Sequence, residues 1–369
     1  METGVSYFSG RDLRHVRADL ADMVEHGCTY VVHCFTETDL TYNLKGMADI
    51  VRATRDIGLQ PWADPWGLCG IFSGETFSRF LLEHPESWQV RSDGRAVPAA
   101  CPRDPAAREF LRAWVTRAAE IGMQVLFWDE PHFWADWQQP DETWTCLCPL
   151  CQDAFLDRFR TRMPTVFTEE VRQFREETLL ELMADLCRAG RRAGLRNALC
   201  LLPSDLAAHG FVDAERRFAA RLNRRRVQRG LPPLEGLPPA LRYFGIGDWE
   251  AAAAIPDLDI FGCDPYWFTF EADPEPFTET YLARALRAAR RAAELTRRPR
   301  KTQLWVQGFA VPAGRERELF GAVRLGARMG ATHVAAWSYR GLAGMSYNAP
   351  DRPEVVWQVI GEAFRSVRG

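Results

Sequence analysis

Short apolar segments recur along this chain, and longer segments of helical period separate them. Eight segments are rich in β-branched, aromatic and other apolar residues, as expected for buried strands. Between them, apolar residues recur every three or four positions, and several of these helical segments end in a glycine just before the next strand. This alternation predicts a parallel sheet covered by helices. The predicted strands are 4–10, 29–37, 59–67, 123–131, 197–205, 258–268, 302–309 and 333–341.

Eight strand and helix units favour one α/β fold, the (β/α)8 TIM barrel. Such a barrel typically has about 250 residues, whereas this chain has 369. We expect the excess in long insertions after strands, at about 68–105, 131–163 and 206–250. No internal repeat or low-complexity linker divides the sequence, so we expect one domain that spans residues 1–369.

The composition is that of a globular protein, with 47% hydrophobic and 26% charged residues. A net charge of -3 argues against nucleic acid or an anionic membrane surface as a partner. The chain starts without a secretory signal pattern and has no apolar run of membrane-spanning length, so we expect a cytoplasmic location. Apolar helix faces can cover a barrel or join subunits, so a homo-oligomer is compatible with the sequence.

Residues for cofactor chemistry are scarce. Almost all basic residues are arginine, and neither Lys45 nor Lys301 lies at the end of a predicted strand. Schiff-base chemistry therefore has no nucleophile in the expected place. No glycine-rich turn matches a dinucleotide or phosphate motif, so we expect no organic cofactor.

Two adjacent acids, Asp129 and Glu130, follow the apolar run of the predicted fourth strand. Active sites of TIM barrels lie at the C-terminal ends of the strands, which places both acids at the functional face. Because side chains alternate along a strand, we expect only one of the two to point toward the barrel centre. We predict that Glu130 points inward with Trp128, while Asp129 points outward. Aromatic surroundings favour a protonated carboxyl, which suits Glu130 to the role of general acid.

Large aromatic residues accompany polar side chains at the other predicted strand ends. The chain has 13 tryptophans, a high number for its length. Aromatic rings offer platforms for sugar rings, and glycoside hydrolysis requires a pair of carboxyl groups. We therefore predict a site for a carbohydrate substrate. Its predicted substrate-binding residues are Glu37, Asp64, Trp66, Trp128, His132, Tyr266, Trp267, Trp305, Gln307, Trp337, Tyr339 and Arg340.

A cluster of cysteines follows the acids of strand four. Cys146, Cys148 and Cys151 form the pattern C-x-C-x-x-C, and three thiols at this spacing can bind one metal ion. Tetrahedral zinc takes a fourth ligand, for which Cys101 in the preceding insertion is the candidate. Ten cysteines without framework spacing predict free thiols or metal ligands rather than disulfides, and we expect the other six in the core.

The acid-bearing fourth strand, the C-x-C-x-x-C loop and the earlier lone cysteine together resemble a known family. They look like glycoside hydrolase family 42 β-galactosidases and their relatives in the large retaining clan of (β/α)8 glycosidases. The specific similarity covers about residues 95–160. It implies a structural zinc on the four cysteines named above, and it places Glu130 at the position of the family's acid/base.

The chain departs from that family at two positions. Asp129 precedes Glu130 where the family has Asn, and Gln307 ends strand seven where the family has its nucleophilic Glu. We expect Asp264, at the end of strand six and beside two aromatic residues, to supply the second carboxyl. In one arrangement Glu130 is the acid and Asp264 activates water in an inverting reaction. In the other, Asp129 is the nucleophile and Asp264 the acid/base of a retaining reaction.

Two other classes of function are compatible with the sequence. Gln307 at the nucleophile position suits a barrel that binds a glycan without cleaving it. A metal-dependent lyase or isomerase would use His33, His132 and nearby acids, although the chain has no H-x-H or H-E-x-x-H motif. Our main hypothesis is a glycosidase that acts on a small glycoside or oligosaccharide through paired carboxylates on strands four and six.

Overall fold

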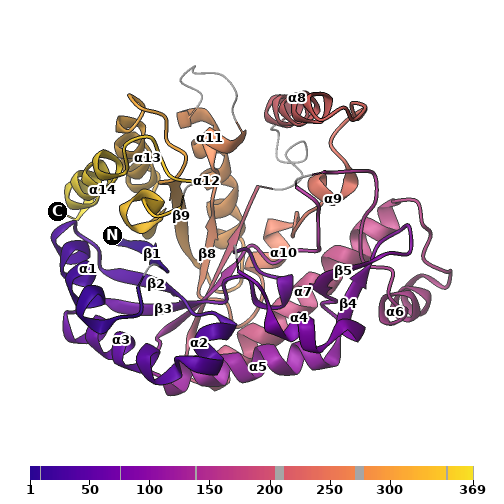
Figure 1. Ribbon diagram of the computed structural model, residues 1–369, viewed down its shortest axis with the longest axis horizontal. Helices are drawn as coiled ribbons and strands as arrows, with labels where there is room; N and C mark the ends of the chain where they lie inside the picture. The colour runs from indigo at the N-terminus through magenta and orange to yellow at the C-terminus, as the bar shows by residue number, and fades with distance from the viewer. Residues whose placement is uncertain are drawn as a thin grey trace.

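The structure, a computed structural model, describes residues 1–8, 10–74, 76–137, 139–203, 212–270, 278–345 and 348–368. Eight parallel strands close into a barrel in the order β1-β10-β9-β8-β7-β6-β3-β2 (Figure 1). The predicted (β/α)8 barrel is therefore confirmed. Its strands are β1 (Glu2–Tyr7), β2 (Tyr30–Cys34), β3 (Gln60–Asp64), β6 (Val125–Asp129), β7 (Arg196–Leu201), β8 (Ile260–Cys263), β9 (Lys301–Gln307) and β10 (His333–Trp337).

Each predicted strand overlaps an observed one, but most observed strands end earlier. Glu130 and Asp264, for example, lie just beyond β6 and β8 rather than within them. The polar and proline residues that close each predicted segment belong to the loops at the mouth of the barrel. Residues 204 and 205 of the predicted fifth strand lie outside the described residues.

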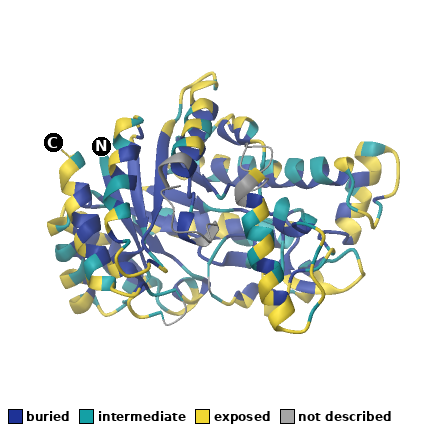
Figure 2. Cartoon of the chain, turned by 90° about the horizontal axis from the view of Figure 1, so that it is seen from above, coloured by how far each residue is buried: buried dark blue, intermediate teal, exposed yellow. Residues whose placement is uncertain are grey.

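Helices surround the barrel, with buried inner faces and exposed outer faces (Figure 2). A glycine with a positive φ follows several of them, as the sequence predicts; Gly122, for example, has a φ of 91°. No helix among the described residues is both long and apolar enough to cross a membrane. These helices are α1 (Leu13–Glu25), α2 (Glu37–Tyr42), α3 (Leu44–Asp56), α5 (Pro105–Glu120), α7 (Glu169–Arg192), α11 (Trp267–Phe270), α12 (Thr278–Glu294), α13 (Arg317–Arg328), η3 (Tyr339–Leu342) and α14 (Pro353–Val367).

The insertions carry further short elements. In the first insertion, β4 (Trp88–Val90) and β5 (Ala96–Ala100) form an antiparallel hairpin that the sequence did not predict. The second insertion contains α6 (Pro149–Phe159). Residues 206–211 of the third insertion lie outside the described residues. The remaining elements are η1 (Leu68–Gly70), α4 (Arg79–Glu83), η2 (Pro85–Ser87), α8 (Val212–Gln228), α9 (Pro239–Arg242) and α10 (Trp249–Ala253).

Side chains fill the interior of the barrel. The ring centroids of Tyr30 and Trp62 lie 4.3 Å apart, and those of Phe127 and Trp305 lie 4.8 Å apart. Because this interior is packed, chemistry must take place at the C-terminal mouth. The interior residues are Tyr30, Val32, Trp62, Val125, Phe127, Ala198, Cys200, Ile260, Trp305 and Ala335.

Candidate active site

A cleft of about 220 Å³ lies at the C-terminal mouth of the barrel. The segments that follow β3, β6, β8, β9 and β10 contribute its walls. The structure brings five predicted site residues together here: Trp66, Asp129, Glu130, Tyr266 and Trp337. Four further lining residues were not predicted, and they are Ser73, Gly74, Phe309 and Asn348.

Both acids of the fourth strand line this cleft, which corrects the expectation that only one can. Phe127 belongs to the barrel interior, so Asp129 two residues later lies on the inner face of the same strand. Trp128 points outward, and its indole N–H donates a hydrogen bond to Asn197 (3.1 Å). Glu130 has a φ of 40°, a left-handed conformation that non-glycine residues seldom adopt. The chain turns at that residue, and the side chain of Glu130 reaches the cleft as well.

The loop after β3 holds Glu130 in place. The Ser73 hydroxyl donates a hydrogen bond to the Glu130 carboxylate, and the Ser73 N–H donates one to the backbone oxygen of Asp129 (3.2 Å). The Glu130 N–H donates to the backbone oxygen of Cys200 on β7 (3.1 Å). Nδ1 of His132 lies 2.6 Å from the Glu130 backbone oxygen. No sequence signal singles out Ser73, because it lies inside a long insertion.

Asp264 lies beneath the cleft rather than on its surface. Its side chain follows β8 directly, and the residue is only 1% exposed. Burial raises the pKa of Asp264 well above its usual range, and the neighbouring carboxyl groups of Glu130 and Asp129 raise it further. This environment favours the protonated form, which suits the acid/base role of Asp264 in the retaining arrangement better than the role of a base for water in the inverting one. It suits a carboxyl that holds a proton beside Glu130.

Aromatic rings form the walls around the acids. The ring centroids of Trp66 and Trp337 lie 6.0 Å apart, and Phe8 contacts both, at 4.9 and 5.8 Å. Tyr266 packs edge-on against Phe309 at 5.0 Å. Burial raises the pKa of Tyr266 well above its usual range, which keeps its hydroxyl protonated as a hydrogen-bond donor. The walls therefore offer the apolar faces and polar edge that a sugar ring requires.

Gly74 allows the loop backbone to pack closely against the Trp66 ring. Gly74 has a φ of 142°, and a Cβ atom on it would lie 2.1 Å from the Trp66 ring. Any larger residue would displace Trp66 or the loop. Two consecutive residues thus position both sides of the site: Ser73 holds Glu130, and Gly74 packs against Trp66.

Several predicted substrate-binding residues lie away from the cleft. Trp305 lies in the barrel interior, and the buried indole N–H of Trp267 donates to Glu318 (3.1 Å). Gln307 is buried; its side chain accepts a hydrogen bond from the Phe268 N–H (2.9 Å) and donates one to a backbone oxygen. Asp64 is fully buried. Together with Trp128, these residues support the framework of the site rather than its surface.

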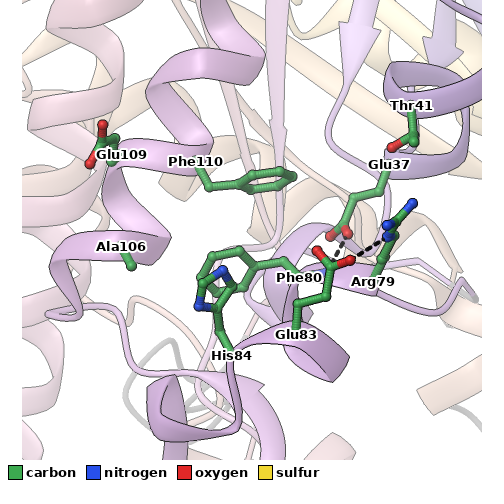
Figure 3. Close-up of a pocket in the computed structure, with 9 residues that line it drawn as sticks. All are labelled: Glu37, Thr41, Arg79, Phe80, Glu83, His84, Ala106, Glu109 and Phe110. Atoms are coloured by element: carbon green, nitrogen blue, oxygen red, sulfur yellow. Dashed lines mark hydrogen bonds and ion pairs between the residues drawn. The ribbon is translucent and has the colours of Figure 1, made fainter.

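Glu37 lies in a separate cavity of about 430 Å³ between α2, α4 and α5 (Figure 3). Its carboxylate accepts hydrogen bonds from the Phe80 N–H (2.8 Å), the Ser78 hydroxyl (2.5 Å) and the Cys69 N–H (3.3 Å). The residue is 5% exposed. Glu37 therefore anchors the first insertion to α2, which is a structural role that strand-end position alone does not reveal.

Tyr339 and Arg340 line a third cavity, of about 440 Å³. The Tyr339 hydroxyl lies 3.0 Å from a carboxylate oxygen of Asp19 and 2.9 Å from one of Asp22. Arg340 forms an ion pair with Glu354. These two predicted residues are thus separated from the acids of strand four.

Among the described residues, neither His33 nor His132 forms a group of metal ligands with the acids. His33 is buried, and its Nε2 lies 3.0 Å from the Thr54 hydroxyl; burial lowers the pKa of His33 to about 3. His132 stacks on Phe244 at 4.1 Å, and burial lowers the pKa of His132 as well. Within the part of the chain that the structure describes, the one group of metal-ligating side chains is a cysteine cluster. The ligand set expected for a metal-dependent lyase or isomerase is thus not brought together within the described ranges.

That cluster consists of the four predicted cysteines, Cys101, Cys146, Cys148 and Cys151. All four are buried, and their sulfur atoms lie within 4.8 Å of one another. The sulfur of Cys101 lies 3.4 Å from that of Cys151 and 3.5 Å from that of Cys148. Four thiols gathered this closely from two insertions can hold a metal ion. All ten cysteines of the chain are free and buried, as predicted.

No known family model matches this chain, and no curated protein matches its sequence. Solved structures share its fold. The PgaB (BpsB) glycoside hydrolase domain from Bordetella bronchiseptica has a TM-score of 0.57 at 12% identity, over 98% of this chain and 99% of that chain. The endo-β-1,4-mannanase from Thermotoga petrophila has a TM-score of 0.56 at 10% identity, over 100% and 77%. GH5_18 from Streptomyces cattleya in complex with GlcNAc has a TM-score of 0.55 at 16% identity, over 100% and 80%.

At these identities the similarity establishes the class of fold, a (β/α)8 barrel of the kind found in those proteins. It does not establish a family, and the resemblance to family 42 stays a prediction.

Proposed function

We propose that this protein is a glycoside hydrolase that acts on a small glycoside or oligosaccharide. One observation carries the proposal: Asp129 and Glu130 line a cleft with aromatic walls, and a third carboxyl, Asp264, is buried beside them. Glycoside hydrolysis requires carboxyl groups that can donate a proton and stabilise positive charge at the anomeric carbon. Two of the similar structures are an endo-β-1,4-mannanase and a glycoside hydrolase domain, which supports the same class.

The surroundings of the three carboxyls suggest their roles. Glu130 reaches the cleft and receives a hydrogen bond from Ser73, so it is positioned to protonate the glycosidic oxygen. Asp264 is buried and holds the proton of the pair; it passes this proton to Glu130, which gives it to the glycosidic oxygen as the bond to the anomeric carbon breaks. Water then adds to the anomeric carbon and returns one proton to the ionised pair. Asp129 supplies the negative charge that an oxocarbenium-like transition state requires. In this version the working carboxyls on the cleft surface both come from strand four, and Asp264 of strand six acts through Glu130.

The cysteine cluster fits a structural zinc ion. Cys101, Cys146, Cys148 and Cys151 would provide the four sulfur ligands of a closed tetrahedral site, which leaves no position for substrate. The ion would cross-link the two insertions that flank the fourth strand, and it would take no part in the chemistry.

A barrel that binds a glycan without cleaving it is the second candidate. Gln307 stands at the end of β9, and its amide is occupied by backbone groups. The nearby acids Glu316 and Glu318 pair with Arg352 and Arg315, so neither replaces a strand-seven nucleophile. This candidate predicts glycan binding with no turnover.

The test is hydrolysis of a panel of aryl glycosides and of oligosaccharides that contain mannose or GlcNAc. We expect product from at least one substrate, and we expect Glu130→Gln and Asp129→Asn each to reduce kcat by at least about 100-fold. Asp153→Asn, an exposed carboxylate on α6, serves as the matched control and should retain full activity. Oligosaccharide binding without any product would favour the binding protein. Turnover that survives both cleft substitutions would contradict the proposed site.

A further inference from the structure

Arg175 is a buried arginine beside the cysteine cluster. It lies on α7 and is 3% exposed. Its guanidinium donates hydrogen bonds to the backbone oxygens of Thr145 and Tyr243, the second at 3.1 Å. It also lies over the Phe133 ring, 4.4 Å from the ring centroid. The side chain is therefore held rigidly, in surroundings that are largely apolar.

This guanidinium has no carboxylate partner within the part of the chain that the structure describes. No Asp or Glu oxygen among the described residues lies within 4.0 Å of its nitrogens, whereas Arg172, one turn earlier, pairs with both Glu169 and Glu176. A buried charge without a counter-charge is strongly unfavourable. Arg175 lies next to the cysteine cluster, because the backbone oxygen of Thr145 that it binds directly precedes Cys146. The groups that contact its charge are backbone oxygens and the Phe133 ring, and none of them is negatively charged.

The charge of a metal site resolves this conflict. Four thiolates carry -4 and a zinc ion +2, so a zinc tetrathiolate has a net charge of -2. We propose that Arg175 is the counter-charge of a zinc tetrathiolate formed by Cys101, Cys146, Cys148 and Cys151. This inference rests on the zinc site proposed above, and it adds a residue outside the ligand set that determines how tightly the metal is held.

The same side chain connects the metal loop to the candidate active site. Arg175 joins the backbone of Thr145, next to the first ligand of the loop, to the segment that contains Phe244. Phe244 stacks on His132, whose ring contacts the backbone oxygen of Glu130. Zinc binding therefore stabilises the segment with Phe244, which supports Glu130 through His132. The zinc ion itself does not contact substrate.

Zinc affinity of the whole protein tests the inference directly. Zinc content is measured by mass spectrometry, and affinity by competition with a chromogenic chelator at fixed pH. The variants are Arg175→Gln, which removes the charge but keeps an amide donor, and Arg175→Lys, which keeps the charge. Arg188→Gln, an exposed position on the same helix, is the control. We expect Arg175→Gln to bind zinc about 10- to 100-fold more weakly, while Arg175→Lys and Arg188→Gln stay close to wild type.

Each outcome separates the inference from the proposals on which it rests. Equal zinc affinity in wild type and Arg175→Gln overturns the role of Arg175 and leaves the zinc site standing. If Arg175→Lys loses as much zinc affinity as Arg175→Gln does, the charge of residue 175 does not explain the zinc affinity. That result also overturns the inference. If Arg175→Gln does not fold, Arg175→Met, which also removes the charge, takes its place in the comparison. If wild-type protein binds no zinc, both the zinc site and the counter-charge role of Arg175 are refuted. Glycosidase activity is measured in a separate experiment, so the proposed function is tested independently.

Discussion

The carboxyl group of Asp264 is buried and interacts with that of Glu130, which lines the cleft. Two carboxyl groups in such a setting cannot both be ionised without a large cost, so one proton stays with the pair. Because the buried member is the better place for a neutral group, Asp264 favours the protonated form. Asp264 therefore holds a proton that it can pass to Glu130, the member of the pair that faces substrate.

Replacement of Asp264 tests whether its proton is used in the reaction. Asp264→Asn keeps the size of the side chain and a hydrogen-bond donor, but it cannot release a proton. We expect kcat to fall by about 100-fold or more with little change in KM, and the alkaline limb of the pH profile of kcat to move to lower pH, because Glu130 loses the carboxyl that shares its proton. Near-normal turnover with an unchanged pH profile would remove Asp264 from the mechanism.

The same variant should change how stability depends on pH. The pKa of Asp264 is raised in the folded protein above its ordinary value of 3.8. A raised pKa means that the folded state binds the proton more tightly, so this stabilisation is complete below about pH 4 and is lost as pH rises through the folded pKa. Asp264→Asn has no such titration.

Denaturant unfolding at several pH values between 5 and 9 measures this difference. We expect the wild type to lose stability relative to Asp264→Asn as the pH increases. Stability curves that stay parallel across that range would contradict a raised pKa at Asp264.

Ser73 is expected to act through Glu130. Its hydroxyl is a charge-assisted donor to the Glu130 carboxylate, and such hydrogen bonds contribute about 1.5–3 kcal/mol. Ser73→Ala should therefore lower kcat by about tenfold or more and leave KM nearly unchanged. Ser73→Thr retains the hydroxyl and should restore most of the rate. If Thr is as slow as Ala, the shape of the loop and not the hydrogen bond explains the effect.

Gly74 tests whether Trp66 forms a wall for substrate. A Cβ at this position collides with the Trp66 ring, and the φ of 142° adds strain for any other residue. We expect Gly74→Ala to raise KM by about tenfold and to change tryptophan fluorescence, because the ring must move. Gly236→Ala, at a loop glycine with open space around it, is the control and should behave as wild type. A normal KM in Gly74→Ala would show that Trp66 does not contact substrate.

Removal of zinc should affect stability before it affects chemistry. A closed site of four buried cysteines contributes folding free energy, so we expect chelation to lower Tm by about 10 °C or more. Protein that remains folded after chelation should keep its kcat. Cys148→Ser should reproduce the loss of Tm and abolish the response to chelator, whereas Cys187→Ala, distant in sequence from the cluster, should respond as wild type does. Immediate loss of kcat in folded protein would indicate a catalytic metal instead.

The sequence could predict the fold because its signals are local. Strand and helix periods are set by backbone geometry, so eight apolar runs separated by amphipathic segments already specify a (β/α)8 barrel. The cysteine cluster was predictable for a similar reason: three of its members lie within six residues, and only Cys101 had to be inferred. The acids of strand four were found because the fold places function at strand ends.

The arrangement of the site depended on contacts that no local pattern records. Both faces of β6 are apolar, one against the barrel interior and one against the helices, so the sequence did not reveal that Asp129 faces inward. The positive φ of Glu130, the reach of Ser73 from another loop and the burial of Asp264 arise from barrel closure and loop packing. The sequence by itself determined the barrel, the strand ends and the metal-type loop, because these follow from short-range periodicity. Only the tertiary structure decided which acids and rings meet, because that depends on the register and packing of segments far apart in the chain.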